Sequence, residues 1–353
     1  MNSEQALDRT RALRMTLLIG TDEAGYGPNL GPLVISATAW RIPDEQGNAD
    51  LFDVLSSVVG RASEPGRLAI ADSKLLYKPG GGLAALEQGV LAAWHASASG
   101  SDGGDSRPLR PGPVAATGEL SRLRSWREAW RSLAPAVVSC FDGVPWYADY
   151  DEPLPIDADA KQIVPLADHF GAALGAAGMG LECIRATAVL PAKFNRLLER
   201  HTSKGTALSH ETLTLVKQVM ECSPATRILI RCDKHGGRNR YGPLLQTLFP
   251  EYLVEIVREG REQSIYRWGP ESRRVEIRFI AKCESQLPAA LASMVSKYLR
   301  ELAMRAFNAF WKTHVADLRP TAGYPVDARR FKQQIQKTQV VLGVDDGLLW
   351  RNK

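Results

Sequence analysis

Residues 18–37, LIGTDEAGYGPNLGPLVISA, restrict the possible folds of this chain more than any other segment. An apolar run ends in Asp22 and Glu23, and a second apolar run begins after a turn. The turn GYGPNLGP is too rich in glycine and proline to be helical, so we expect strands over 15–20 and 32–40. Two adjacent carboxylates beside a glycine-rich turn can hold a divalent metal next to a phosphate, which indicates an active site; the alternative is a solvated turn.

The bulk composition excludes few classes of protein. With 353 residues, 44% of them hydrophobic, the chain can form one large globular domain or a core with a large insertion. A formal net charge of +5 is compatible with a polyanionic partner and equally with a basic enzyme that binds no nucleic acid. The five cysteines form no CxxC pair, so we expect neither a zinc site nor a disulfide framework, and a reducing compartment.

The distribution of apolar residues predicts a protein without a membrane partner. The segment MNSEQALDRTRALR lacks the apolar core of a signal peptide, and no stretch reaches the roughly 18 apolar residues of a membrane span. We therefore expect a soluble, cytoplasmic protein, and we expect it to be a monomer.

Apolar runs alternate with amphipathic stretches along the chain, which predicts an α/β fold. Further strands are expected at 181–190, 227–233, 252–258 and 273–280. Helices are expected at 50–60, 83–96, 119–133, 162–177, 191–201, 208–222, 243–249 and 287–315. We interpret 1–96 and 161–315 as a discontinuous core, 97–160 as an insertion containing a flexible loop and a helix, and 316–353 as a C-terminal extension.

Asp233 ends the apolar run RILIRCD in the same way that Asp22 and Glu23 end theirs. Ligands of open α/β sheets gather at the carboxyl ends of strands, so these three groups can converge. Clustered carboxylates repel one another unless a hard cation such as Mg²⁺ lies among them. Two such ions, about 3.5–4 Å apart, would support phosphodiester hydrolysis. For Asp233 alone, a turn-forming role at a strand end is the alternative.

A fourth carboxylate is a candidate in the segment ALASMVSKYLRELAM. Ser293, Lys297 and Glu301 stand at positions i, i+4 and i+8, so they share one face of the predicted helix. Glu301 is therefore either part of the acidic site or a solvated ion-pair partner of Lys297.

These motifs together resemble the type 2 ribonuclease H family, that is, ribonuclease HII and its HIII relative. GTDEAGYGPNLGPLV resembles the family signature, and RILIRCD its strand with the third acid. Asp72-Ser73-Lys74, the helix ALASMVSKYLRE and Gly323-Tyr324 are similar to the family's later motifs, in the same order. The resemblance implies an RNase H-like fold, a mixed five-stranded sheet flanked by helices, and we expect it to carry a helical C-terminal region and an insertion. It also implies a Mg²⁺- or Mn²⁺-dependent endonuclease that cleaves the RNA strand of RNA–DNA hybrids, or ribonucleotides in duplex DNA, leaving 5′-phosphate and 3′-OH ends.

The resemblance also assigns residues. It implies that Asp22, Glu23 and Asp233 are catalytic metal ligands and that Glu301 takes the place of the fourth acid. Substrate contacts are expected from Gly25, Tyr26, Gly27, Lys74, Lys234, His235, Arg238, Ser293, Lys297 and Tyr324.

The chain departs from the family pattern at several positions. Tyr26 stands where the family has Arg or Lys, and Glu301 where it has Asp. The segment KHGGRNR after Asp233 is more basic than usual, so it either grips phosphates, with His235 as a candidate proton donor, or is a solvated loop. These departures keep two other functions open: an RNase H-like binding protein without catalysis, and a nuclease of this fold that acts on another duplex.

Tryptophans and arginines outside these motifs have two interpretations. Trp126 and Trp130 either dock nucleic acid together with neighbouring arginines or pack on the core, and packing is the interpretation that we favour. The basic residues that follow Tyr324, which we expect to touch a duplex backbone, are Arg329, Arg330 and Lys332.

Overall fold

The computed structural model describes residues 15–78, 80–99, 123–201 and 203–352, and in this part of the chain one large mixed sheet forms the centre. The strand order is β5-β2-β1-β6-β9-β8-β7. The bounds are β1 Met15–Ala24, β2 Leu33–Pro43, β5 Gly180–Val189, β6 Arg227–Asp233, β7 Glu255–Arg258, β8 Gln263–Trp268 and β9 Arg274–Ile280. A two-stranded sheet pairs β3 (Val59–Gly60) with β4 (Leu68–Ala69). The α/β prediction is confirmed, but the expected count of five is wrong because the main sheet has seven strands.

Two kinds of pairing meet in the middle of the main sheet. β1 runs antiparallel to β2 and β2 antiparallel to β5, whereas β1, β6 and β9 run parallel. The carboxyl ends of these three strands therefore lie at one edge of the sheet. β8 and β7 add an antiparallel extension beyond β9, and β8 is the strand that we did not expect.

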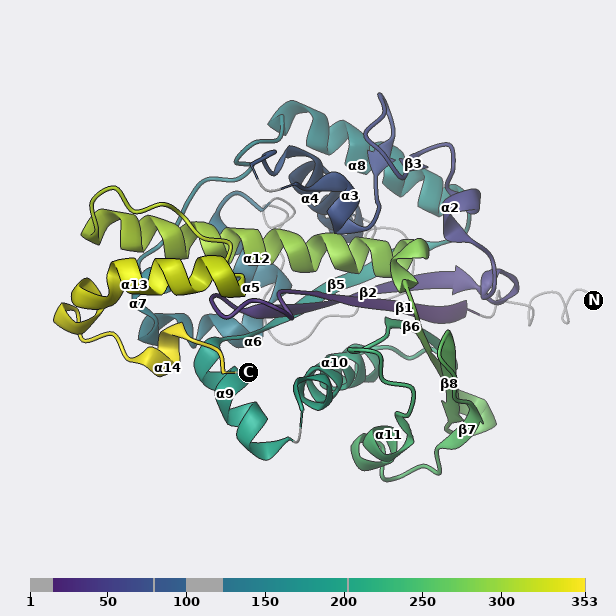
Figure 1. Ribbon diagram of the computed structural model, residues 1–353. Helices are drawn as coiled ribbons and strands as arrows, with labels where there is room; N and C mark the ends of the chain where they lie inside the picture. The colour runs from purple at the N-terminus through teal and green to yellow at the C-terminus, as the bar shows by residue number, and fades with distance from the viewer. Residues whose placement is uncertain (1–14, 79, 100–122, 202, 353) are drawn as a thin grey trace, which may run out of the picture.

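Helices cover both faces of the sheet, with α4, α8 and α12 on one side and α10 and α11 on the other (Figure 1). The longer helices are α4 Ala84–Ser99, α5 Trp126–Leu133, α8 Ala160–Ala176, α9 Pro191–Arg200, α10 Lys204–Glu221, α11 Gly242–Leu248, α12 Leu287–His314 and α13 Pro325–Val341. Single turns of helix are α2 Leu51–Val54, α3 Ser73–Leu76, α6 Pro135–Val138, α7 Pro145–Ala148 and α14 Asp346–Leu349. The helix expected at 50–60 is therefore one turn long, α13 lies in the C-terminal region that we expected to be helical, and 119–122 lie outside the described residues.

The start of α12 lies directly on β1 because Gly20 has no side chain. A Cβ atom at Gly20 would stand 2.2 Å from the carbonyl carbon of Pro288, the second residue of α12. The Thr38 hydroxyl of β2 donates to the Pro288 carbonyl at 2.8 Å, which fixes the helix from the neighbouring strand. This contact places the first turns of α12 beside the acidic end of β1.

The tryptophans of α5 belong to the core. Trp126 and Trp130 are 0% and 1% exposed, and the Trp126 indole donates to the Leu302 carbonyl of α12 at 2.9 Å. The packing interpretation of these two residues is therefore confirmed.

The division into core, insertion and extension stays a prediction.

Glu87 of α4 joins three distant segments. Its carboxylate is fully buried and accepts hydrogen bonds from the backbone N–H groups of Ile156, Asp157 and Ala158 at 2.7–2.9 Å. It also accepts one from the Tyr298 hydroxyl of α12 at 2.9 Å. With four donors around it, this buried carboxylate is well satisfied.

No helix among the described residues has the length and apolar character that crossing a bilayer demands.

Candidate active site

Asp22 and Asp233 stand side by side at the carboxyl edge of the sheet. Thr21 of β1 is in register with Cys232 of β6, so the next residues of the two parallel strands are the two aspartates. Burial, opposed by a hydrogen bond from Ser293 and assisted by the charge of Asp233, raises the pKa of Asp22 to about 7. The expected convergence of these two strand ends is thus present in the structure.

Glu23 belongs to the same electrostatic group. Burial raises its pKa well above the usual range, and the charges of Asp22 and Asp233 raise it further. The pKa of Asp233 is also raised by burial, although its carboxylate accepts a backbone hydrogen bond from Cys283 at 3.0 Å. The charge of Asp233 thus raises the pKa values of both Asp22 and Glu23, so the three carboxylates lie within one electrostatic environment.

Glu284 is an acidic neighbour of this group that the sequence analysis missed. It lies in the single helical turn Cys283–Ser285, between β9 and α12. Burial raises its pKa first and the charge of Asp233 next, and Glu284 in turn raises the pKa values of Asp22 and Glu23. The rule that pointed to Asp233 would also have found Glu284, because it follows a strand parallel to β6.

Glu301 lies elsewhere on α12. Its carboxylate binds the Lys297 ammonium at 2.5 Å and the Tyr77 hydroxyl at 2.9 Å. Eight residues separate it from Ser293, which is about 12 Å along a helix axis. The structure therefore favours the ion-pair interpretation of Glu301, and Glu284, not Glu301, is the fourth carboxylate next to Asp22, Glu23 and Asp233.

Two tyrosines, Tyr77 and Tyr324, lie near this ion pair. The Lys297 ammonium lies 4.3 Å from the centre of the Tyr77 ring. Burial, and then the charge of Glu301, raises the pKa of Tyr77, with a smaller contribution from Tyr324, which lies at the N-cap of α13 and is 54% exposed. Lys297 and Tyr324 thus remain candidates for substrate contact. They lie next to the group formed by Asp22, Glu23, Asp233 and Glu284, here called the acidic edge, rather than within it.

The Asp72-Ser73-Lys74 corner lies against the acids. The Asp72 carboxylate caps α3 by accepting from the backbone N–H of Lys74 at 3.0 Å. The Lys74 side chain is 83% exposed, and its charge acts to lower the pKa values of Glu23 and Asp233. Lys74 is therefore an accessible cation beside the carboxylates, as expected for a substrate contact.

Ser293 faces the acids and not the solvent. Its side chain is buried, its hydroxyl lies 3.1 Å from the Ser73 hydroxyl, and it hydrogen-bonds to Asp22. The predicted direct contact of Ser293 with substrate is thus wrong, because its hydroxyl faces Ser73 and Asp22. One turn later, the Ser296 hydroxyl donates to the backbone carbonyl of Asp22 at 3.0 Å.

The glycine-rich turn and the segment after Asp233 enclose a pocket of about 520 Å³. Its lining residues are Tyr26, Ser203, Lys204, Gly205, His235, Gly236, Gly237 and Arg238. Gly25 has a φ of 88°, which only glycine adopts freely, and Gly27 is exposed. The Tyr26 hydroxyl approaches Gly236 so closely that a Cβ there would lie 3.0 Å from it. Arg238 reaches the first turn of α10, where it donates to the Thr206 hydroxyl at 2.6 Å.

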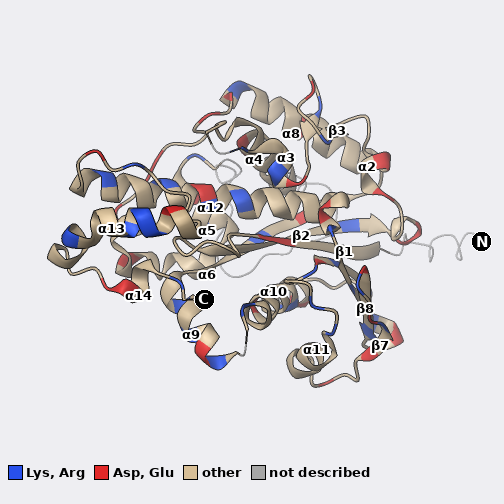
Figure 2. Ribbon diagram, in the orientation of Figure 1, with Lys and Arg blue, Asp and Glu red and all other residues tan. Residues whose placement is uncertain are grey.

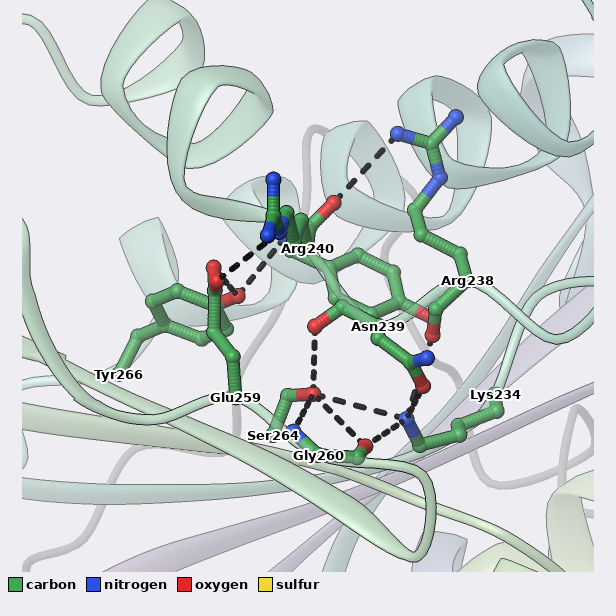
Figure 3. A network of polar contacts seen from close by, with 9 residues as sticks. Lys234, Arg238, Asn239, Arg240, Glu259, Gly260, Ser264 and Tyr266 are labelled. Atoms are coloured by element: carbon green, nitrogen blue, oxygen red, sulfur yellow. Dashed lines mark hydrogen bonds and ion pairs between the residues drawn. The ribbon is translucent and has the colours of Figure 1, made fainter.

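Two predicted substrate contacts, Lys234 and His235, are instead structural. Figure 3 shows the Lys234 ammonium inside a loop, where the acceptors are the Gly260 carbonyl at 2.6 Å, the Asn239 amide oxygen at 2.8 Å and the Arg238 carbonyl at 3.2 Å. With the Ser264 hydroxyl at 3.5 Å, four acceptors surround the three donors of this ammonium, so no donor is left for a phosphate.

His235 is 2% exposed, and its Nδ1 atom lies 2.9 Å from the Ser209 hydroxyl. Burial, helped by the charge of Arg238, lowers its pKa to about 3. The imidazole is therefore neutral near pH 7, and the proposed proton donation by His235 is not supported.

Ion pairs compensate part of the charge on α13. Figure 2 shows the basic residues of this helix in blue. Arg330 pairs with Asp327 at 2.6 Å and Lys332 with Asp346 at 2.7 Å, whereas Arg329 is exposed. Arg329 is therefore the strongest of the three candidates for contact with a duplex backbone.

The donors of the acidic edge suit a hard divalent cation. Asp22, Glu23, Asp233 and Glu284 supply only oxygen atoms, the ligand type that Mg²⁺ prefers, and all four have raised pKa values. No group of three or more His, Cys, Asp and Glu side chains in the described ranges is arranged so that it could hold a metal ion. The site fits such an ion by the chemistry of its donors and not as a ready-made cage.

No family model and no curated protein matches the chain. Among solved structures, it is similar to ribonuclease HII from Archaeoglobus fulgidus, solved in complex with PCNA (13% identity, 96% of this chain and 94% of that chain, TM-score 0.37). It is also similar to ribonuclease H2 from Pyrococcus horikoshii OT3 (15%, 94% and 92%, 0.36) and to Bst-RNase HIII in complex with Mn²⁺ (15%, 96% and 67%, 0.38). These identities and TM-scores are too low to assign the chain to a family or an activity.

Proposed function

We propose that the protein is a metal-dependent endonuclease that cleaves the RNA strand of RNA–DNA hybrids or ribonucleotides embedded in duplex DNA. The observation that carries the proposal is the group of Asp22, Glu23 and Asp233 at the ends of two adjacent parallel strands, joined by Glu284. The signature in which Asp22 and Glu23 stand resembles type 2 ribonucleases H, which connects this group of acids to phosphodiester hydrolysis.

The four carboxylates would hold Mg²⁺ or Mn²⁺, which when bound would activate water and stabilise the leaving oxygen. The chain's own residues position the acids: Ser293 holds the Asp22 carboxylate and the Cys283 N–H holds that of Asp233. The exposed Lys74 ammonium lies beside them, where it can bind a phosphate oxygen.

Arg238 supplies the positive charge that Tyr26 lacks. Both side chains line the same pocket, and the Tyr26 hydroxyl packs against Gly236, two residues before Arg238. In this proposal, Tyr26 contacts the sugar next to the cleaved bond through its ring and hydroxyl, and Arg238 binds a backbone phosphate. Recognition of the ribonucleotide is thus divided between two segments instead of residing in one cationic turn.

The test uses labelled duplexes whose scissile strand is all RNA, DNA with one ribonucleotide, or all DNA, each with Mg²⁺ or Mn²⁺. We expect cleavage confined to the RNA-containing duplexes and its loss in Asp22→Asn. Tight binding without cleavage would instead indicate a binding protein. Equal cleavage of all-DNA duplexes would indicate a nuclease with a different substrate.

A further inference from the structure

Residues 350–352, here called the strap, lie against the glycine-rich turn of the candidate site. The backbone N–H of Arg351 donates to the Asn29 carbonyl at 2.8 Å, and the Asn29 side-chain amide donates to the Arg351 carbonyl at 3.0 Å. Leu30 and Trp350 form an antiparallel bridge. The strap therefore pairs with the turn as a short strand, and Figure 1 shows the C-terminus beside α9.

The Arg351 side chain is buried beneath the turn. It is 1% exposed, its Nη2 atom donates to the Pro28 carbonyl, and its guanidinium lies 4.9 Å from the Phe194 ring centre. Its Nε and Nη1 atoms are buried and have no hydrogen-bond partner among the described residues. Burial, and then the charge of Arg300, lowers its pKa.

A buried cation without a carboxylate partner costs folding free energy, so Arg351 is a poor choice for stability alone. What it contributes is a donor to a carbonyl of the turn, a group that would otherwise be buried unpaired. A residue that is unfavourable for the fold but fixes backbone next to a reactive centre has the character of a positioning residue.

The turn has few internal means of keeping its shape. Gly25 and Gly31 adopt φ values of 88° and 75°, and the backbone N–H groups of Asn29 and Leu30 donate to the Gly323 carbonyl at 2.8 and 3.3 Å. Arg300 donates to the Pro32 carbonyl at 2.6 Å. The contacts that hold the turn thus come from distant segments, and the strap holds its middle.

We propose that Arg351 is a positioning residue that fixes the 25–32 turn, and with it Tyr26, against the acids at the end of β1. The effect on catalysis rests on the proposed function, whereas the effect on the turn does not. The strap thereby becomes part of the site although it lies more than 300 residues from Asp22 in the sequence.

Hydrogen exchange of the intact protein tests the structural part. Arg351→Met keeps an apolar chain of similar length and removes the donor to Pro28. We expect at least tenfold faster exchange of backbone amides in 25–32, with unchanged exchange in 15–22. Unchanged exchange in 25–32 would overturn the proposal whatever the activity of the protein.

Steady-state cleavage of a ribonucleotide-containing duplex tests the catalytic part. Arg351→Met should lower kcat at least tenfold, leave KM within about threefold and leave Tm equal or higher. Arg351→Lys, which keeps a donor, should recover part of kcat. A parallel loss of Tm and kcat in Arg351→Met would overturn the positioning role in favour of a merely structural one, and so would an unchanged kcat.

Arg305→Met is the matched control. Arg305 is an arginine of α12 whose guanidinium, among the described residues, hydrogen-bonds to the Glu152 carboxylate at 2.5 and 3.1 Å. It should lower Tm without changing kcat or the exchange of 25–32, the reverse of Arg351→Met. If the wild-type protein cleaves no RNA-containing duplex, the proposed function fails, and the exchange result still decides the role of Arg351.

Discussion

The Asp233 carboxylate accepts a hydrogen bond from the backbone N–H of Cys283, 3.0 Å away. This bond ties the end of β6 to the turn that carries Glu284. A carboxylate held by the backbone beside another acid keeps its position without a salt bridge, which would neutralise it. The bond therefore holds the turn that carries Glu284 beside Asp233.

Substitution of the two candidate fourth acids should separate their roles. Glu284→Gln removes a charge from the acidic group, and we expect kcat/KM on an RNA–DNA hybrid to fall on the order of 100-fold or more. Glu301→Gln is the isosteric control on α12 and should lose only its pairing with Lys297, about 0.3–0.5 kcal/mol of stability. The reverse ranking of the two variants would restore Glu301 as the metal ligand.

Arg238→Ala should weaken binding to RNA–DNA hybrids equally for all sequences. If Arg238 contacts one phosphate, the slope of log K against log salt concentration decreases by about one. Binding to a catalytically inactive Asp22→Asn background, measured by fluorescence anisotropy at several salt concentrations, gives this slope. Arg200→Ala, at the exposed end of α9, is the control and should leave the slope unchanged.

The contribution of His235 to the stability of the fold should fall as pH decreases below 6.5. Its pKa is lowered from 6.5 to about 3 in the folded state, so between these values the unfolded chain binds a proton that the folded chain does not. This stabilisation is complete above pH 6.5 and is lost as pH falls towards 3, by up to about 1.4 kcal/mol per pH unit. Urea unfolding of the wild type and of His235→Gln at several pH values measures this loss as a difference in the slope of the unfolding free energy against pH. Parallel slopes for the two proteins would contradict the prediction.

Trp126→Ala should destabilise the protein by about 3–5 kcal/mol, because it leaves a large cavity and removes the hydrogen bond to the Leu302 carbonyl. Arg131→Ala, exposed on the same helix, should change stability by less than about 0.5 kcal/mol. Denaturant unfolding gives both values. A Trp126→Ala protein that folds normally and loses only affinity for nucleic acid would return this tryptophan to a binding surface.

The parts of the site that follow from strand ends could be predicted from the sequence. Asp22, Glu23 and Asp233 each end an apolar run, and parallel strands bring such ends together. Glu284 was missed because it does not end the apolar run of β9 but follows it, inside a single helical turn, while Glu301 drew attention by its spacing from Lys297. The failure at His235 and Lys234 has another cause: residue type suggests a role, but only tertiary contacts determine which side chains are buried or already bonded.

The sheet shows the same limit. The strands β1, β2, β5, β6 and β9 have long apolar runs that identify them, whereas β8 buries only alternate residues of a six-residue segment. Short strands of this kind depend on a neighbouring strand for their stability, and the chain alone does not reveal that neighbour.

The four hydrogen bonds to the Glu87 carboxylate have a consequence for the order in which the protein folds. Its partners lie 69–71 and 211 residues away along the chain, so two large loops must close before the carboxylate is surrounded by donors. Contacts of such high sequence separation form late. We therefore expect Glu87→Gln to accelerate unfolding while leaving the refolding rate nearly unchanged, which makes Glu87 a determinant of the lifetime of the native state rather than of the speed of its formation.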